Sequence, residues 1–388
     1  MANTITNLIP DMYSALDIVS RELVGIIPAV TRDSTTERAA VGQTVRSFVA
    51  PAATATNITP GVTPPDDGDQ TIGNTTLQIT KARRVPFRWN GEQTLGLNNG
   101  GPGARAIQVN QIAQALRTLV NEVEVDLCAL ANGASRAYGT ANTTPFASDL
   151  SDTAQVRKIL DDNGAPLTDR HLIIDTTAGA KMRTLTQLTK ANEAADSTLL
   201  RQGELLNVHG FAIRESAQVA NPAVGTSNNA GTTDTAGYAI GATAITLAAA
   251  GTGTIVTGDI VTFTGDTNKY VVAFGVASLA AGGVLTLAAP GLRVALAASN
   301  VTVTVVAKSR RNIAFSRNAL VLAQRLPALP DGGDLAIDRT TVQDPRSGLV
   351  FEIAMYPQYR QMQYEISHAY GVAVTKAEHI AILLGQNG

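Results

Sequence analysis

Few side chains of this sequence have the types and spacing that chemistry requires. The four histidines are scattered, and no two have the spacing of zinc ligands on one helix: His171, His209, His368 and His379. The single cysteine, Cys128, stands among apolar residues, which indicates a buried helix position and not a reactive thiol. No Gly-x-Ser-x-Gly motif of a hydrolase occurs. We therefore predict that the chain is not an enzyme and has no catalytic residue, no metal site and no cofactor.

Two further patterns have structural interpretations. Asp66, Asp67 and Asp69 lie around a glycine, as in a calcium loop, but the later glutamate of an EF-hand is missing. Because two prolines precede them, we interpret these aspartates as part of a solvated turn at the tip of an extended arm. The glycines of residues 100–103 precede a helical pattern but lack the lysine of a phosphate loop, so they indicate a hinge.

A basic run combines cations with aromatic side chains, as nucleic-acid-binding surfaces do. Its members are Lys81, Arg83, Arg84, Phe87, Arg88 and Trp89. The net charge of the whole chain is only −2, and a strand over this run places cations on both of its faces. We therefore favour ion pairs with neighbouring subunits over nucleic-acid binding.

The clearest helical pattern covers residues 102–132. Its apolar residues recur every three or four positions, at Val109, Ile112, Leu116, Leu119, Val123, Leu127 and Leu130. A helix of about 30 residues is roughly 45 Å long and needs a sheet along its length to cover one apolar stripe. A shorter amphipathic helix is expected between residues 9 and 23.

Residues 53–90 predict an extended two-stranded arm. Residues 53–69 are poor in charge and rich in Thr, Ala and Pro, whereas Leu77 and Ile79 alternate with polar residues, as in a half-buried strand. Such a stretch buries little apolar surface of its own, so we expect it to complete its packing on another molecule. Aromatic residues make up only 4% of the chain, which also favours a subunit that its partners help to stabilise.

Composition divides the rest of the chain. Residues 150–215 mix helix and strand patterns, as an α/β domain does. Residues 222–308 begin with a Gly/Ser/Asn/Thr linker and continue as short strands separated by turns, which predicts an inserted β-barrel or sandwich. Strands at 335–342 and 349–356 then flank a hairpin turn that contains Arg346. No apolar run approaches about 18 residues, so we expect no membrane-spanning helix.

The order of these blocks resembles the major capsid (coat) proteins of tailed bacteriophages. Within them it is similar to the short-tailed Salmonella phage type, whose members carry an inserted β-barrel domain. The resemblance extends over essentially the whole chain. The segments that carry it are Asn7-Leu-Ile-Pro10, Ser20-Arg-Glu-Leu-Val24, Thr63-Pro-Pro-Asp-Asp-Gly-Asp-Gln-Thr-Ile-Gly73, Leu116-Arg-Thr-Leu-Val-Asn-Glu122, Ser135-Arg-Ala-Tyr-Gly139, His209-Gly-Phe-Ala-Ile-Arg-Glu-Ser216 and Asn312-Ile-Ala-Phe-Ser-Arg-Asn-Ala319.

The resemblance implies an α+β fold, the capsid fold that tailed phages share with herpesviruses. The implied regions are an N-terminal arm (1–45), an extended loop (46–99), a peripheral domain with a spine helix (100–139), an axial α/β domain (140–221 and 309–330), an inserted β-barrel (222–308) and a strand-rich return to the peripheral and axial domains (331–388). In this fold the extended loop lies over a neighbouring subunit. The hairpin around Pro345 would lie near local threefold contacts, and the inserted domain would steady the subunit and contact neighbours across twofold axes.

The function that the resemblance implies is that of a major capsid protein of a double-stranded DNA phage. Copies would self-assemble as hexamers and pentamers into an icosahedral shell in the cytoplasm of a bacterial host, with no membrane contact. Implied partners are a scaffolding protein, the portal protein, in some phages a decoration protein, and packaged DNA through non-specific contacts. We expect intersubunit contacts at Asp66, Asp67, Asp69, Lys81, Arg83, Arg84, Arg88, Trp89 and Arg346.

Two points remain open at the level of sequence. Some related coat proteins join a loop lysine to a neighbour's asparagine, but no residue pattern assigns a partner to Lys81, so we predict non-covalent assembly. The alternative function is a carbohydrate-binding or tail-fibre-like β protein whose working part is the Thr/Gly-rich region 238–307. Tyr238 and Tyr270 are the only tyrosines there, and there is no tryptophan, which argues against a sugar-stacking surface.

Overall fold

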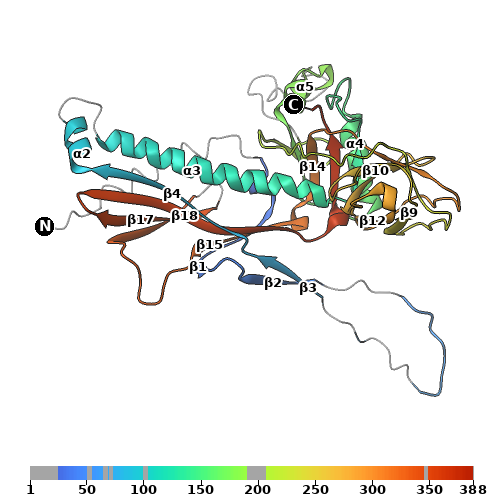
Figure 1. Cartoon of the computed structure of the whole chain (residues 1–388), viewed down its shortest axis with the longest axis horizontal. Coiled ribbons are helices and arrows are strands. Elements are labelled where there is room, and N and C mark those ends of the chain that lie inside the picture. The colour runs from blue at the N-terminus through green and yellow to red at the C-terminus, as the bar shows by residue number, and fades with distance from the viewer. Residues whose placement is uncertain are drawn as a thin grey trace.

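The computed structural model describes residues 25–49, 55–63, 69, 73–98, 104–189, 207–344 and 348–387. The fold is α+β, as expected, and consists of two large sheets and one long helix. In Figure 1 the helix runs along a six-stranded sheet in an elongated part, which continues into a broader part that contains the second sheet. The expected helix at 9–23 and the glycines at 100–103 lie outside the described residues.

Helix α3 (Ala104–Ala129) confirms the long helical pattern. Its 26 residues correspond to about 39 Å. The apolar stripe faces the core, and Ile112, Leu116, Val123 and Leu127 are all buried there. Cys128 is buried in the same core, as predicted, and burial raises the pKa of its thiol. A short helix α2 (Gly91–Asn98) precedes α3, and the 3-10 turn η3 (Leu130–Gly133) ends it.

The first sheet has the strand order β1-β15-β18-β17-β16, and β4 also pairs with β18, off this path. These strands are β1 (Thr31–Ala39), β4 (Lys81–Asn90), β15 (Leu320–Pro327), β16 (Asp338–Gln343), β17 (Val350–Gln358) and β18 (Gln361–Val374). Strand β18 is the centre of the sheet because it pairs with β4, β15 and β17. The predicted hairpin at 335–356 is the antiparallel pair β16–β17.

The extended arm is shorter than the sequence indicated. We expected residues 81–90 in the arm, but they form β4 and pair with β18 along their whole length. The reason is their alternation: Val85 and Phe87 pack against the core beneath α3, and the ring of Phe87 stacks on Tyr364 with centroids 5.2 Å apart. The arm itself is a two-stranded ribbon of β2 (Thr44–Val49) and β3 (Gly73–Gln78).

The second sheet follows the path β7-β6-β14-β19-β5-β11-β10-β13-β8. Its first five strands are β7 (Phe211–Glu215), β6 (Arg170–Ile174), β14 (Arg311–Ser316), β19 (Ile380–Leu384) and β5 (Arg136–Tyr138). We call these five strands, together with helices α4 (Ser151–Asp162), α5 (Thr176–Arg183) and α6 (Thr186–Thr189), the α/β lobe. The 3-10 turn η5 (Arg317–Ala319) separates β14 from β15, so β15 lies in the first sheet although residues 309–330 were expected to belong to the axial domain.

Six short strands between residues 222 and 308 form what we call the β module. Its strands are β8 (Gly231–Thr232), β9 (Ala244–Leu247), β10 (Ile260–Phe263), β11 (Lys269–Phe274), β12 (Gly283–Leu287) and β13 (Thr302–Val305). A separate apolar core holds it together, and Val261, Phe263, Val272 and Leu285 are among its buried members. The module is joined to the rest of the second sheet where β11 pairs with β5 over two residue pairs.

Candidate assembly surfaces

The segment 55–63 lies beyond the outer end of the β2–β3 ribbon, away from both sheets (Figure 1). Every residue in this segment is exposed. Ile58 is 97% exposed and Val62 is fully exposed, and the segment contains no charged residue. Apolar side chains that their own chain leaves in water are typical of a surface that another molecule covers.

One face of β4 holds helix α3 by ion pairs. The Lys81 Nζ atom lies 2.7 Å from an Asp126 carboxylate oxygen, and the Arg83 Nε atom lies 2.6 Å from Glu122 Oε1. The Tyr370 hydroxyl donates a further hydrogen bond of 2.6 Å to Asp126. Both carboxylates belong to α3, so these contacts fix the helix on the sheet, each exposed pair contributing up to about 1 kcal/mol.

The other residues of the basic run also have partners in their own chain. The Arg84 Nη1 atom lies 2.6 Å from Glu365 Oε2 on β18, and the Trp89 indole donates a 2.7 Å hydrogen bond to Gln111 on α3. Arg88 is exposed. Contact with a neighbouring copy is therefore not needed to neutralise Lys81, Arg83 or Arg84, although the sequence suggested such a role for them.

Of the remaining residues that we expected at intersubunit contacts, the structure describes only one. Asp66, Asp67 and Arg346 lie outside the described residues. Asp69 is described and is exposed.

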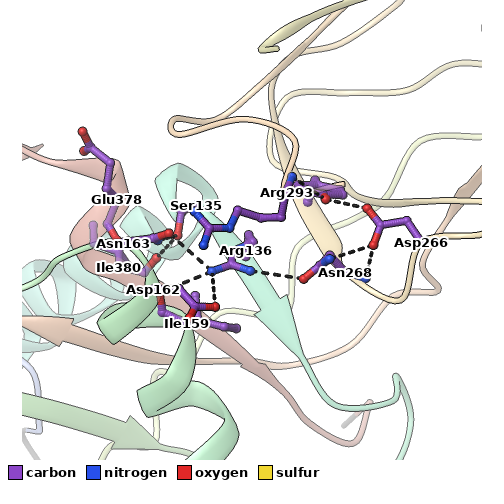
Figure 2. A network of polar contacts seen from close by, with 11 residues as sticks. Ser135, Arg136, Ile159, Asp162, Asn163, Asp266, Asn268, Arg293, Glu378 and Ile380 are labelled. Atoms are coloured by element: carbon purple, nitrogen blue, oxygen red, sulfur yellow. Dashed lines mark hydrogen bonds and ion pairs between the residues drawn. The ribbon is translucent and has the colours of Figure 1, made fainter. Parts of the chain in front are cut away.

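A polar network joins the β module to the α/β lobe, and Figure 2 shows it in close view. Arg136 on β5 is buried, and its Nη1 atom donates to Asn268 Oδ1 of the module at 3.1 Å. The Nη2 atom lies 3.3 Å from both Asp162 Oδ2 and Asn163 Oδ1 near the end of α4. Burial lowers the pKa of Arg136, and the hydrogen bond to Asp162 acts in the opposite direction.

The network continues into the module. Asp266 accepts hydrogen bonds from the amide and the side chain of Asn268, at 2.8 and 2.7 Å, and from the Tyr270 hydroxyl at 2.5 Å. That hydroxyl accepts a 2.9 Å hydrogen bond from the Arg293 backbone (Figure 2). The Nη atoms of Arg136 thus link the α4 end of the α/β lobe to the β module, which gives the two parts a defined relative position, although the buried Nε atom of the same guanidinium has no hydrogen-bond partner among the described residues.

A second buried contact, made by Arg311, joins the β module to the end of α3, the spine helix. Arg311 on β14 donates to Asn132 Oδ1 at 2.6 Å and also to the carbonyl oxygen of Gly258. Burial lowers the pKa of Arg311 to about 10, against which the nearby Asp259 carboxylate acts. Asp259 is itself fully buried and accepts a 2.8 Å hydrogen bond from the Val256 amide. Removal of either charged group would leave the other buried without the opposite charge nearby.

Glu124 is the least exposed acidic side chain of α3, at 1%. Its Oε1 atom accepts hydrogen bonds from the Gly25 amide at 2.8 Å, the Ile26 amide at 3.0 Å and the Ser216 hydroxyl at 2.7 Å. Its Oε2 atom accepts a 3.2 Å hydrogen bond from the Ile27 amide, at the start of the 3-10 turn η2 (Ile27–Ala29). Burial raises the pKa of Glu124, and these hydrogen bonds lower it. The carboxylate thereby ties the chain entering β1 to the spine helix and to the α/β lobe.

Sequence reasoning missed these buried polar groups. The sequence analysis singled out none of Glu124, Arg136 and Arg311. Their partners are far away in sequence, by 99 residues for the Glu124–Gly25 contact, and no local pattern signals them. Within the described residues there is no cluster of three or more histidine, cysteine or acidic side chains that could bind a metal ion. No helix in the same part of the chain has the length and apolar character to cross a membrane.

The aromatic groups of the β module bear on the carbohydrate-binding alternative. Tyr270 is 1% exposed, and its hydroxyl belongs to the junction network. The Tyr238 hydroxyl donates a 2.8 Å hydrogen bond to Asp234 and accepts one from the Thr246 amide. Neither tyrosine thus presents a free ring face with an unused hydroxyl, the arrangement with which sugars are usually stacked and held.

No protein-family model matches the sequence, and no curated protein matches it. The fold is similar to several solved structures. A chain of the capsid of cyanophage P-SCSP1u is 12% identical, covers 93% of this chain and 87% of its own, and superposes with a TM-score of 0.49. A chain from Mycobacterium phage Che8 is 12% identical, with coverage of 89% and 85% and a TM-score of 0.45.

A chain of the virus-like particle from Pyrococcus furiosus is 11% identical, with coverage of 96% and 98% and a TM-score of 0.42. All three TM-scores lie below 0.5, and all three identities lie far below 25%.

Proposed function

We propose that this chain is a major capsid protein of a tailed double-stranded DNA bacteriophage, which self-assembles as hexamers and pentamers into an icosahedral shell. The observation that carries the proposal is the segment 55–63, which extends away from the body and leaves Ile58 and Val62 in water. A protein that acts as a monomer gains nothing from such an arm, whereas a shell subunit needs surfaces that only its neighbours complete.

Two further features support the same function. The spine helix is held on the sheet by ion pairs and by a continuous apolar core, so the elongated part is a stiff plate. The β module has its own core and is tied to the α/β lobe through buried arginines, which suits a brace of the kind found in coats of the short-tailed Salmonella phage type. The scaffolding, portal and decoration proteins, packaged DNA and assembly in a bacterial cytoplasm belong to this proposal. So do contacts of the exposed Asp69 and Arg88 with neighbouring subunits.

Assembly is the direct test. The purified chain, alone and with the scaffolding protein of the same phage, is examined by sedimentation velocity and negative-stain electron microscopy, and closed shells are expected. A matched variant replaces Ile58 and Val62 with serine. Because both side chains are exposed, it should keep the circular dichroism spectrum of the parent but lose assembly. A chain that stays monomeric at high concentration with the scaffolding protein present would contradict the proposal.

A further inference from the structure

The β module has an unusual surface for a protein in water: it is almost without charge. Residues 235–258 and 270–292 contain no acidic or basic residue and no histidine. Two of the charged residues between and beside these runs, Asp259 and Asp266, are buried. A surface without charge lacks the usual protection against association.

These two runs form one exposed sheet face. Strand β12 pairs antiparallel with β9, with Val284 opposite Thr246, and also with β11, with Thr286 opposite Phe274. The alternate side chains point inward, and Ile245, Leu247, Leu285 and Leu287 are buried in the module core. A register shift in β11 after Val272 turns Phe274 to the outer face. Phe274 is consequently 70% exposed and Val284 is 54% exposed.

We call the outer side of β9, β12 and the end of β11 the uncharged face, with Ala244, Thr246, Phe274, Val284 and Thr286 as its members. An exposed phenylalanine beside a valine, on a flat sheet that carries only alanine and threonine otherwise, is a surface whose burial is favourable. Its occupant must also lack charge, because a buried charge without a partner here would be strongly unfavourable.

Residues 55–63 are an exposed segment without charge that carries two large apolar side chains and lies away from both sheets. Leu335, Tyr359 and Leu167 are also exposed, but charged residues stand next to them or two positions away. Val41 and Leu95 are exposed in uncharged stretches, but Val41 lies in the turn between β1 and β2 and Leu95 lies on helix α2, so neither belongs to an extended segment. The chain between β2 and β3 has 23 residues, so its middle residue, Gly61, can lie at most roughly 40 Å from the ends of both strands. In its own chain the segment is fully exposed and so does not lie on the uncharged face.

We propose that segment 55–63 of one copy docks on the uncharged face of a second copy, with Ile58 and Val62 packed against Phe274 and Val284. The inference rests on the proposed self-assembly, and it names the surface of the neighbour that receives the arm. It gives the β module a second role besides bracing its own subunit, namely to bind an extended peptide of its neighbour.

Photo-crosslinking in assembled particles tests this contact. A benzophenone analogue of phenylalanine replaces Phe274, which preserves the apolar ring. The host's Leu167, 67% exposed, receives the same analogue as the matched control. Particles are assembled from mixed 14N and 15N subunits and irradiated, and the linked peptides are identified by mass spectrometry. The Phe274 probe is expected to capture the peptide that contains 55–63, with mixed isotope pairs, and at least tenfold more often than the Leu167 probe does.

The outcomes separate the inference from the proposed function. Shells in which the Phe274 probe captures another module, a different protein or only its own chain would overturn the docking and leave self-assembly intact. Subunits that form no shells would contradict the proposed function and the docking with it. A second variant, Val62→Asp, is 15N-labelled and added as a small fraction to 14N parent subunits that carry the Phe274 probe, so that shells still form. The probe should capture the variant's 55–63 peptide at least tenfold less often than it captures the same peptide of 15N Leu167→Asp subunits added in the same proportion.

Discussion

The imidazole of His368 lies in the core of the six-stranded sheet. It is 0% exposed, its ring centroid is 5.4 Å from Phe351 and 5.0 Å from Tyr370, and its Nδ1 atom lies 3.2 Å from the side-chain amide nitrogen of Gln324. Burial lowers the pKa of His368 to about 3. In the unfolded chain an imidazole titrates near 6.5, so below that pH the unfolded state binds a proton that the folded state does not.

We therefore expect the free energy of unfolding to fall as the pH drops from about 6.5 toward 3, by up to about 1.4 kcal/mol per pH unit from this group. The variant His368→Phe should remove this contribution, because a phenylalanine ring binds no proton in either the folded or the unfolded state. Urea unfolding at pH 7.0, 6.0 and 5.0 measures the slope. His209→Gln, at an exposed position, is the control and should retain the His368 contribution. An unchanged slope in His368→Phe would refute the assignment.

Glu124 leads to a second residue-level prediction. Glu124→Gln preserves the shape but places an amide N–H group opposite one of the backbone amides of residues 25–27. We expect a loss of about 3 kcal/mol in the free energy of unfolding, the size of one charge-assisted hydrogen bond and one unpaired buried donor. Glu122→Gln, at an exposed ion pair two residues away, should cost about 1 kcal/mol or less. Equal effects of the two substitutions in urea titrations would show that the buried carboxylate has no special role.

At this scale the sequence predicted apolar burial well and polar burial poorly. Cys128 and the stripe of α3 were expected in the core because their periodicity is local. In the sequence Glu124 stands between apolar positions of the helix, as a solvent-exposed charged residue would. The groups that donate hydrogen bonds to it come from residues 25–27 and 216, which no pattern within α3 reveals. A buried charge is defined by what surrounds it in space, so one sequence without structure gives no signal for it.

Individual elements were easier to predict than their partners. Residues 81–90 form a strand, as the sequence analysis assumed for the arm, but a strand pattern does not specify which neighbour it pairs with, and β4 pairs with β18 instead of extending the arm. The turn around η5 moves the chain from one sheet to the other between β14 and β15, a change that takes three residues and has no sequence signature.

The joint between β5 and β11 allows an element-level prediction. This pairing comprises only two residue pairs, and the Arg136–Asn268 hydrogen bond reinforces it. Asn268→Ala leaves Arg136 Nη1 without its partner in the module, so the amides of β5 and β11 should exchange with solvent faster, by roughly tenfold for about 1.4 kcal/mol. Hydrogen–deuterium exchange with mass spectrometry measures this. Thr267→Ala, an exposed neighbour, should change nothing, and equal protection in both variants would contradict the role of the joint.

On the scale of the whole molecule, the separate core of the β module predicts that it folds by itself. Residues 222–308 alone should give dispersed amide NMR signals, since most of their buried apolar side chains contact one another in a core of their own. Differences from the full chain are expected at Lys269 and Tyr270, whose β5 partners are missing, and at Ile260, Val271 and Ala288, which pack in the core of the rest of the chain. A collapsed, random-coil spectrum would mean that the host is required for the module to fold.

The central position of β19 has a consequence for how the protein is made. Strand β5 lies parallel to β19, and the Ser135 hydroxyl donates a hydrogen bond to the carbonyl oxygen of Ile380, 245 positions further along the chain. At 5–20 residues per second, a ribosome needs roughly 10–50 s to synthesise the stretch between them. For that time the nascent β5 has an open flank, and strands with open flanks are prone to aggregate. A cell that produces many copies at once would need holdase chaperones to shield this flank until β19 emerges.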